Sequence, residues 1–236
     1  MSVPEWVFDA VFYQIFPDRF ANGDLHNDTP NLQAWNSQPE LHSFYGGDLQ
    51  GIIEKLDHLT ELGVNALYLN PIFLAPSPHR YNTTDYFTID DKLGTMADFR
   101  ALLEAAHARG MRVILDGVFN HTGRGFFAFA DILENQEHSP YQDWYHIHHF
   151  PVDAYTPGEL KDYVGWWGIK SLPKLNTDTP AVRKYLLRVA RHWMEQGADG
   201  WRLDVPNEID DDAFWAEFRQ VVRETNNGIL PIEAEI

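Results

Sequence analysis

The apolar residues of this chain recur at helical spacing in several segments, and each such segment ends in a glycine followed by a short apolar run. The first example is residues 49–63, where one helical face carries Ile52, Ile53, Leu56, Leu59 and Leu62. Gly63 stands where a left-handed carboxyl-terminal cap is favoured. The spacing predicts a helix over residues 49–63 and a strand over residues 64–72.

Two further segments repeat the arrangement: residues 95–110 with 111–120, and residues 179–197 with 198–206. Thr95 and Asp98 have the spacing of a capping box at the start of the first helix. Thr179 and Pro180 are typical of the cap and first position of the second helix. A fourth helix is expected at residues 212–225, and apolar runs at residues 10–20 and 228–236 bring the expected strands to five.

Strands that alternate with helices in this way indicate right-handed βαβ units and a parallel sheet, so the fold class is α/β. The strands are almost continuously apolar, as expected for a sheet covered on both faces. Both a (β/α)8 TIM barrel and a doubly wound sheet fit this pattern. In either fold, ligands bind at the carboxyl ends of the strands.

The segment between residues 122 and 175 breaks the rhythm, because it is rich in Trp, Tyr, His and Gly and shows little periodicity. It is too long for an ordinary loop and predicts a small inserted subdomain over the strand ends. The expected organisation is therefore residues 1–121 and 176–236 as parts of the barrel, with residues 122–175 inserted after the third strand.

Composition narrows the ligand class. The 236 residues carry a net charge of −17 and no cysteine, which excludes disulfides, zinc thiolates and cysteine nucleophiles. The acidic balance disfavours nucleic acid as a partner and suits a neutral ligand or a cation. No apolar run is long enough to span a membrane, and the amino terminus lacks the pattern of a signal peptide, so a cytoplasmic location is expected.

Polar side chains fall at the predicted carboxyl ends of the strands: Asn70, Asp116, Asn120, His121, Asp204 and Glu235. Asp204 and Glu235 end successive strands and can face each other across a cleft. Two carboxylates about 5–5.5 Å apart suit retaining glycoside hydrolysis. Arg202, on the same face as Asp204, would orient this carboxylate and keep it ionised. Each residue taken singly could equally be an ion pair or a cap, and spacing alone does not select glycosides over other carboxylate chemistry.

Several motifs occur in the order and spacing of the α-amylase superfamily, glycoside hydrolase family 13: "DGVFNH" at 116–121, "LPKLN" at 172–176, "GWRLDVPNE" at 200–208 and "AEI" at 234–236. The opening "VFYQIFPDRFANGD" and "FYGGDLQGI" are similar to that family too. The "PKLN" form and the opening resemble its cyclomaltodextrinase, neopullulanase and maltogenic amylase branch. The resemblance implies a TIM barrel and a retaining glycosidase that hydrolyses α-1,4 and α-1,6 bonds in maltooligosaccharides, cyclodextrins or pullulan.

The resemblance also assigns roles by position. Asp204 matches the catalytic nucleophile and Glu235 the general acid/base, and Arg202 matches the arginine beside the nucleophile. Asp116 and Asn120 match supporting residues of the first conserved block, while His121 would contact the reacting sugar. Tyr81, in "HRYNTTDY", matches the tyrosine that stacks on that sugar.

A cation is expected near the amino terminus. The motif "NGDLHND" offers hard oxygen ligands that suit calcium, and an Asx-rich turn that satisfies its own backbone is the alternative. Branch members bind calcium with such a loop, and by position the implied ligands are Asn22, Asp24, Asn27, Asp28, Asp48 and the backbone oxygen of Gly46.

Departures from the family pattern predict an incomplete chain. The third family carboxylate and the later strands are not found, Asp91 replaces an expected proline, and Pro231 and Glu233 interrupt the last motif. Glu233 shares a face with Glu235 and is an alternative acid. We expect about five βα units and little or no activity alone, with self-association or a complementing carboxyl-terminal part restoring it. A transglycosylase or isomerase such as trehalose synthase, and a non-catalytic carbohydrate-binding or structural chain, remain alternatives.

Overall fold

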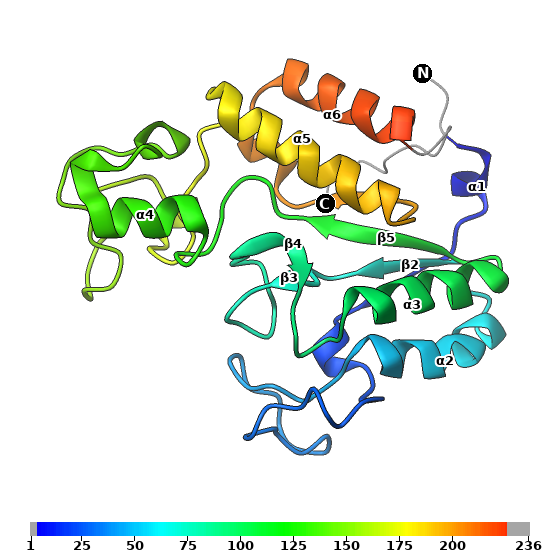
Figure 1. Cartoon of the computed structure of the whole chain (residues 1–236). Coiled ribbons are helices and arrows are strands. Elements are labelled where there is room, and N and C mark those ends of the chain that lie inside the picture. The colour runs from blue at the N-terminus through cyan, green and yellow to red at the C-terminus, as the bar shows by residue number, and fades with distance from the viewer. Residues whose placement is uncertain (1–3, 226–236) are drawn as a thin grey trace.

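A parallel four-stranded sheet forms the centre of the molecule in the computed structural model, which describes residues 4–225 (Figure 1). Its strands are β1 (Phe12–Ile15), β2 (Ala66–Leu69), β5 (Arg112–Gly117) and β6 (Gly200–Leu203). All three strand pairs are parallel, and they follow one another in the order β1-β2-β5-β6. Four of the five predicted strands are therefore confirmed, and the fifth, at residues 228–236, lies outside the described residues.

The strand order separates the two fold classes that fit the sequence. A doubly wound sheet reverses its order at a switch point, whereas these strands add in one direction only. With right-handed crossovers, such an order places the connecting helices on one face, as in a (β/α) barrel. These helices are α2 (Leu49–Glu61), α3 (Met96–Ala108) and α5 (Pro180–Glu195), with α6 (Asp212–Thr225) following β6.

The helix boundaries follow local rules that the sequence predicts. The capping box of Thr95 and Asp98 is present at the start of α3. Asp48 caps α2 by accepting a hydrogen bond from Gly51 N. Thr179 precedes α5 as expected, but its hydroxyl donates to the carbonyl of Asp143 at 2.6 Å and therefore ties the helix to the inserted segment.

Alternate strand residues point to opposite faces of the sheet. The row Leu69, Leu115 and Trp201 is fully buried, and the ring of Trp201 contacts that of Phe218 on α6. This apolar row is the face covered by helices. The other face carries Tyr68 and the paired positions Asp116 and Arg202, so the core lies on one side of the sheet and the polar chemistry on the other.

An antiparallel ribbon that the periodicity did not predict lies between β2 and α3. It pairs β3 (Phe73–Leu74) with β4 (Asp85–Ile89). A two-residue strand has too few positions to show alternation, which explains why the pattern missed it. The loop between the two strands contains Tyr81, so the ribbon determines where this tyrosine lies.

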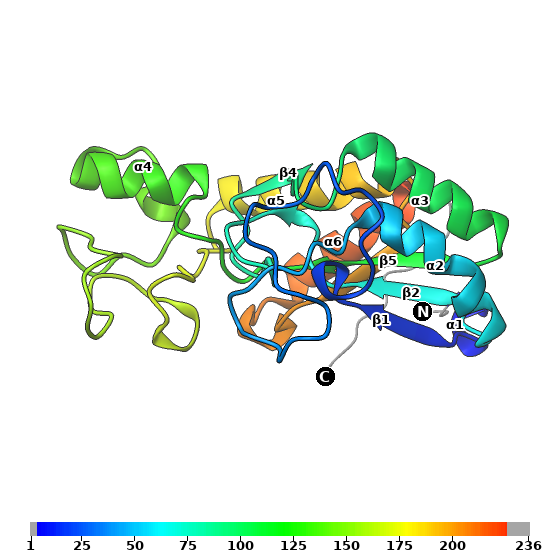
Figure 2. The ribbon, with the colours of Figure 1, turned by 90° about the horizontal axis from the view of Figure 1, so that it is seen from below.

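The segment 122–175 extends away from the sheet in both ribbon views (Figure 1, Figure 2). It contains α4 (Phe127–Asn135) and the short turns η2 (Gln136–His138), η3 (Gln142–Trp144) and η4 (Trp166–Gly168). An isolated bridge between His121 and Lys174 joins its end to the barrel part, and the other isolated bridges of the described residues lie within the segment.

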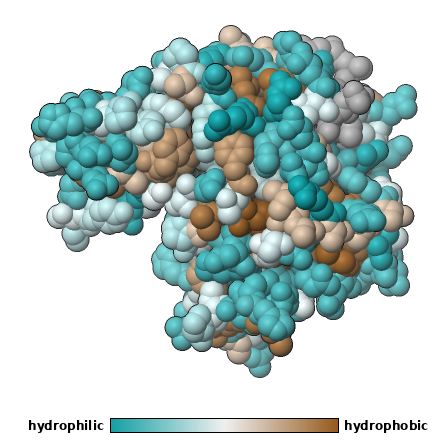
Figure 3. Space-filling model, viewed as in Figure 1, coloured by the Kyte–Doolittle hydropathy of each residue, from teal (hydrophilic) through white to brown (hydrophobic). Residues whose placement is uncertain are grey.

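The remaining short elements are α1 (Glu5–Phe8), η1 (Pro17–Arg19) and η5 (Pro206–Glu208). The face of the molecule in Figure 3 is predominantly hydrophilic, with smaller apolar areas between the polar residues. Among residues 4–225, no helix combines the length and the apolar character needed to cross a membrane.

Candidate active site

Five polar residues gather at the carboxyl ends of three adjacent strands: Tyr68, Asn70, Asp116, Arg202 and Asp204. Strand register explains the gathering, because Asp116 on β5 lies directly opposite Arg202 on β6. Asp204 is two residues beyond Arg202 and therefore shares its face of the sheet. The sequence motifs thus meet at one place.

Arg202 joins the two carboxylates. Its Nη1 donates to Asp116 Oδ1 at 3.1 Å and to Asp204 Oδ1 at 2.8 Å. The Asp116 side chain is fully buried, whereas those of Arg202 and Asp204 keep 18% and 13% of their surface exposed. One guanidinium therefore holds a buried and a partly accessible carboxylate at a fixed spacing, which is the orientation that the sequence predicts for Asp204.

Two phenols complete the surroundings of Asp116. Tyr68 and Tyr81 donate to its Oδ2 at 2.5 Å and 2.8 Å, and Asn70 donates to the Tyr81 hydroxyl at 3.0 Å. Tyr68 is a site residue that our sequence reasoning missed. The available signal was its position two residues before Asn70, which places both on one face of the strand.

Burial dominates the electrostatics of both carboxyls. It raises the pKa of Asp116 to about 6, although Arg202 and the hydroxyl of Tyr68 act in the opposite direction. Burial also raises the pKa of Asp204, and the hydrogen bond and charge of Arg202 oppose it. The predicted contact between Arg202 and Asp204 is thus present, but its effect on the pKa of Asp204 is smaller than that of desolvation.

His121 is fully buried, and both of its ring nitrogens have partners inside the protein. Nε2 lies 3.1 Å from the carbonyl oxygen of Tyr81, and Nδ1 lies 3.2 Å from Nδ2 of Asn120. Burial lowers the pKa of His121 to about 4, so the imidazole is neutral at ordinary pH and donates from Nε2. A sugar hydroxyl that bonds to His121 must therefore replace one of these two contacts.

The structure thus brings six of the predicted residues into one hydrogen-bonded network: Tyr81, Asp116, Asn120, His121, Arg202 and Asp204. Glu235, the predicted acid/base, and its alternative Glu233 lie outside the described residues. The network contains a partly exposed carboxylate, a cation that orients it and hydrogen-bond donors beside it. These groups can bind an uncharged polyol and stabilise positive charge that develops next to Asp204.

The Asx-rich loop near the amino terminus folds around Asp48. The carboxylate of Asp48 accepts hydrogen bonds from the backbone N–H groups of Gly23 and Asp24 as well as from Gly51. Asn22 donates to Asp28 at 2.8 Å, and a side chain at Gly46 would clash with both residues.

Two features of this loop bear on a cation. The side-chain oxygens of Asn22 and Asn27 are buried and have no hydrogen-bond partner, as suits oxygens that coordinate a hard cation. Within residues 4–225, no three His, Cys, Asp or Glu side chains are grouped to hold a metal ion. Amide and backbone oxygens would therefore supply much of the coordination.

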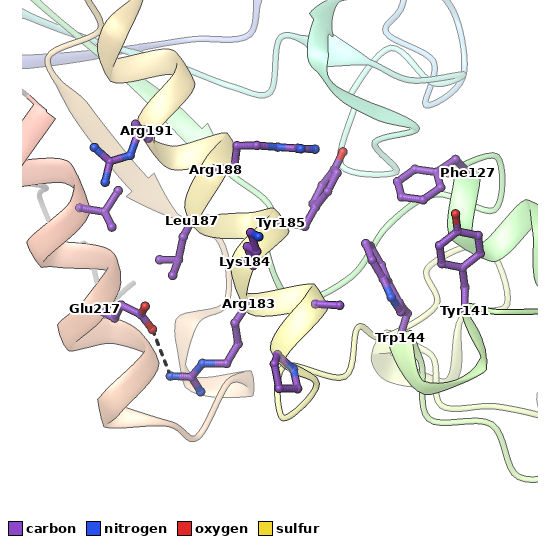
Figure 4. A pocket seen from close by; sticks show the side chains of 13 residues that line it. Phe127, Tyr141, Trp144, Arg183, Lys184, Tyr185, Leu187, Arg188, Arg191 and Glu217 are labelled. Atoms are coloured by element: carbon purple, nitrogen blue, oxygen red, sulfur yellow. Dashed lines mark ion pairs between the residues drawn. The ribbon is translucent and has the colours of Figure 1, made fainter.

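A hollow of about 1020 Å³ lies between the inserted segment and helices α5 and α6 (Figure 4). Phe127, Tyr141 and Trp144 line one side, and α5 supplies basic residues on the other. Arg183 is occupied by ion pairs with Asp211 and Glu217. The hollow is not lined by Asp116, Asp204 or Arg202. Despite its size, it is therefore not the candidate reacting site.

Comparison with known proteins assigns the family of this chain. A family profile described as the alpha-amylase catalytic domain matches residues 14–228. The chain therefore belongs to the α-amylase family, glycoside hydrolase family 13, as its motifs predict.

Individual relatives within the family are similar to this chain over nearly its whole length. The chain is 51% identical to neopullulanase 2 of Thermoactinomyces vulgaris over 231 residues, which are 97% of this chain and 39% of that protein. It is 48% identical to a cyclomaltodextrinase of Thermoanaerobacter pseudethanolicus, covering 93% of this chain and 38% of the relative. Among solved structures, it matches the cyclic α-maltosyl-(1→6)-maltose hydrolase of Arthrobacter globiformis with a TM-score of 0.92, at 48% identity, over 97% of this chain and 51% of that one. The chain thus spans well under two thirds of the length of these relatives.

Proposed function

We propose that this chain carries the nucleophile side of a retaining glycosidase site for α-1,4 and α-1,6 glucosidic bonds in maltooligosaccharides, cyclodextrins and pullulan. The observation that carries the proposal is the bridge from Arg202 to Asp204 and Asp116 at the ends of adjacent strands. The names of the relatives, which include a neopullulanase and a cyclomaltodextrinase, support this substrate class.

In this mechanism the carboxylate of Asp204 attacks the anomeric carbon, and the bond from that carbon to the leaving oxygen breaks. Glu235 gives its proton to the leaving oxygen, and an ester joins the sugar to Asp204. Glu235 then takes a proton from water, whose oxygen attacks the anomeric carbon and frees Asp204. Arg202 keeps the Asp204 oxygen oriented, and buried Asp116 holds Arg202 and the hydroxyl of Tyr81 in place.

This proposal is tested with a chimera in which the chain replaces the matching part of neopullulanase 2. The chimera is assayed beside the 236-residue chain. We expect the chimera to release glucose and maltose from maltotriose and to open β-cyclodextrin. Asp204→Asn should lower this rate by about 10⁴-fold, because the nucleophile acts as part of one cooperating set. The surface variant Asp57→Asn is the control, and equal rates for the chimera and its Asp204→Asn variant would contradict the assignment.

We also propose that calcium binds the loop formed by Asn22, Asp24, Asn27 and Asp28 with Gly46 and Asp48. The support is the pair of buried, unpartnered Asn oxygens and the fit of oxygen ligands to this ion. Calcium at about 100 times its Kd should stabilise the chain by about 2.7 kcal/mol, since it binds only the folded loop. Thermal unfolding with calcium or with chelator measures this, with Asp28→Ala as the variant that should lose the response. Identical melting temperatures in both buffers would contradict calcium binding.

A further inference from the structure

Three aromatic rings form a continuous stack that begins inside the candidate active site and ends in solvent. The ring of His121 stacks on Trp166 at 5.5 Å with 22° between the planes. Trp166 stacks in turn on Trp167 at 4.7 Å and 11°. His121 is buried beside Tyr81, so the stack leads from the hydrogen-bonded network to the protein surface.

The outer end of the stack is unusual for a tryptophan. Trp167 is 80% exposed, although a large apolar side chain is normally withdrawn from water. Its backbone also has φ 51° and ψ 27°, in the left-handed region that bulky residues rarely adopt. Both features raise the free energy of the folded state, and such strain concentrates at sites where a ligand is bound.

The middle of the stack carries an unmet hydrogen bond. The indole N–H of Trp166 is buried and has no acceptor among the described residues. Buried donors in native proteins nearly always have partners, so this N–H is available to a hydroxyl group of a ligand or to water. The loop itself is held by backbone hydrogen bonds, from Trp166 N to Leu172 O and from Ile169 N to Trp166 O.

We propose that Trp167, backed by the ring of Trp166, forms an aromatic platform on which a glucose unit of an α-glucan chain stacks as the chain leaves the reacting site. This inference rests on the proposed function, because the family and its relatives indicate an α-glucan as the ligand. Flat rings with a polar edge suit the apolar face and hydroxyl rim of a pyranose. An α-glucan is uncharged, and stacking on the platform requires no ion pair. Such a ligand therefore agrees with the net charge of −17.

The platform predicts how affinity depends on ligand length. Binding of maltose and maltoheptaose is measured by calorimetry on the 236-residue chain with Asp204→Asn, so that no turnover occurs. We expect maltoheptaose to bind at least tenfold more tightly than maltose. Adding Trp167→Ala should remove most of this tenfold gain and leave the Kd of maltose unchanged within twofold.

The matched control is Tyr155→Ala, which removes another exposed ring, 67% accessible, from the same inserted segment but outside the stack. It should leave the gain for maltoheptaose intact. If Trp167→Ala retains the full gain, the platform is overturned while the α-glucan function stands. Sedimentation could instead show that the chain dimerises through Trp167. If the Kd of maltoheptaose is then unchanged by Trp167→Ala, the platform is also overturned.

The same titration separates this inference from the proposed function. Binding of cellohexaose that depends on Trp167, without binding of maltoheptaose, would overturn the α-glucan assignment and leave a sugar platform. Binding of neither oligosaccharide would overturn both proposals.

Discussion

Strands β5 and β6 carry a buried carboxylate cluster at each end, and the two clusters are built differently. At the amino end, Asp199 accepts hydrogen bonds from His107 at 2.6 Å, Arg112 at 2.9 Å and the backbone N–H of Val113 at 2.8 Å. At the carboxyl end, Arg202 faces two carboxylates, Asp116 and Asp204. The amino-end cluster thus has two basic side chains for one carboxylate, whereas the carboxyl-end cluster has one basic side chain for two carboxylates.

This difference agrees with a structural role for the amino-end cluster and with the function proposed for the carboxyl-end cluster. Asp199 ties α3, β5 and β6 together, and each partner in that cluster stabilises the fold. At the carboxyl end, burial raises the pKa of both Asp116 and Asp204, so their ionised forms cost stability. Perturbed carboxyls in a polar cluster are typical of sites that do chemistry. The amino-end cluster therefore fits a structural role, and the carboxyl-end cluster fits the reactive role that we propose for it.

The largest expected effect comes from removing the shared cation. Arg202→Met leaves Asp116 and Asp204 facing each other without a countercharge, and breaking such a buried pair costs about 3–5 kcal/mol at pH 7. The loss should shrink as the pH falls, because removal of Arg202 raises the pKa of Asp116 above its native value of about 6 and the carboxyl then takes up a proton more readily. Urea unfolding at several pH values measures this.

The control for that experiment is Asp57→Ala, which breaks an exposed pair with Arg109. Because the side chain of Asp57 is 80% exposed, the loss of stability in this variant should be far smaller than that of Arg202→Met at every pH. A loss for Arg202→Met that does not vary with pH would show that the carboxylates do not cause it.

A second effect, of about 3 kcal/mol, should appear in the pH dependence of stability. The pKa of Asp116 rises from 3.8 to about 6, so the folded state keeps its proton longer and stability falls as pH rises through this window. The pKa of His121 falls from 6.5 to about 4, so the unfolded state gains its proton first and stability falls as pH drops through nearly the same window. The two contributions oppose each other in the native protein.

Single variants should reveal each contribution. His121→Gln leaves the Asp116 contribution, so stability should decrease from pH 4 to pH 6 relative to the native chain. Asp116→Asn leaves the His121 contribution and should give the opposite slope. Parallel pH profiles for both variants and the native chain would contradict the two pKa shifts.

The smallest expected effect on stability comes from removing a single tyrosine hydroxyl, whose hydrogen-bond acceptor is charged in one case and neutral in the other. Tyr81→Phe removes the hydroxyl that donates to Asp116 and receives from Asn70, and should cost about 1.5–3 kcal/mol because its acceptor is ionised at pH 7. Tyr163→Phe removes a 2.6 Å hydrogen bond to the carbonyl of Lys170 and should cost about 1 kcal/mol. Thermal unfolding of both variants gives the comparison, and equal losses would contradict it.

Local pattern was enough to predict α2, α3, α5 and α6, four parallel strands and the polar residues at the strand ends, whereas Tyr81 was assigned by the family resemblance. Helical stripes and caps act within a few residues, so Thr95 with Asp98 could be read directly. The polar residues at the ends of predicted strands could be placed together because parallel strands share an edge.

What the sequence did not predict depends on contacts between distant segments. Asp199 meets His107 and Arg112, which are about ninety residues away, and no local pattern marks such a cluster. The stack of Trp166 on His121 also arises from two separate loops. Register alone decides that Tyr68, in an apolar run, points to Asp116 and away from the core.

A matched pair of substitutions tests the difference between the two ends most directly: Asp199→Asn and Asp116→Asn, both at nearly fully buried carboxyls, compared by urea unfolding at pH 7. We expect Asp199→Asn to lose about 3 kcal/mol or more, because an amide cannot accept from all three donors. Asp116→Asn should cost less, because removal of a buried charge whose pKa is raised to about 6 offsets part of the loss of the hydrogen bonds from Arg202, Tyr68 and Tyr81. Equal destabilisation by both substitutions would contradict the division between a stabilising end and a reactive end.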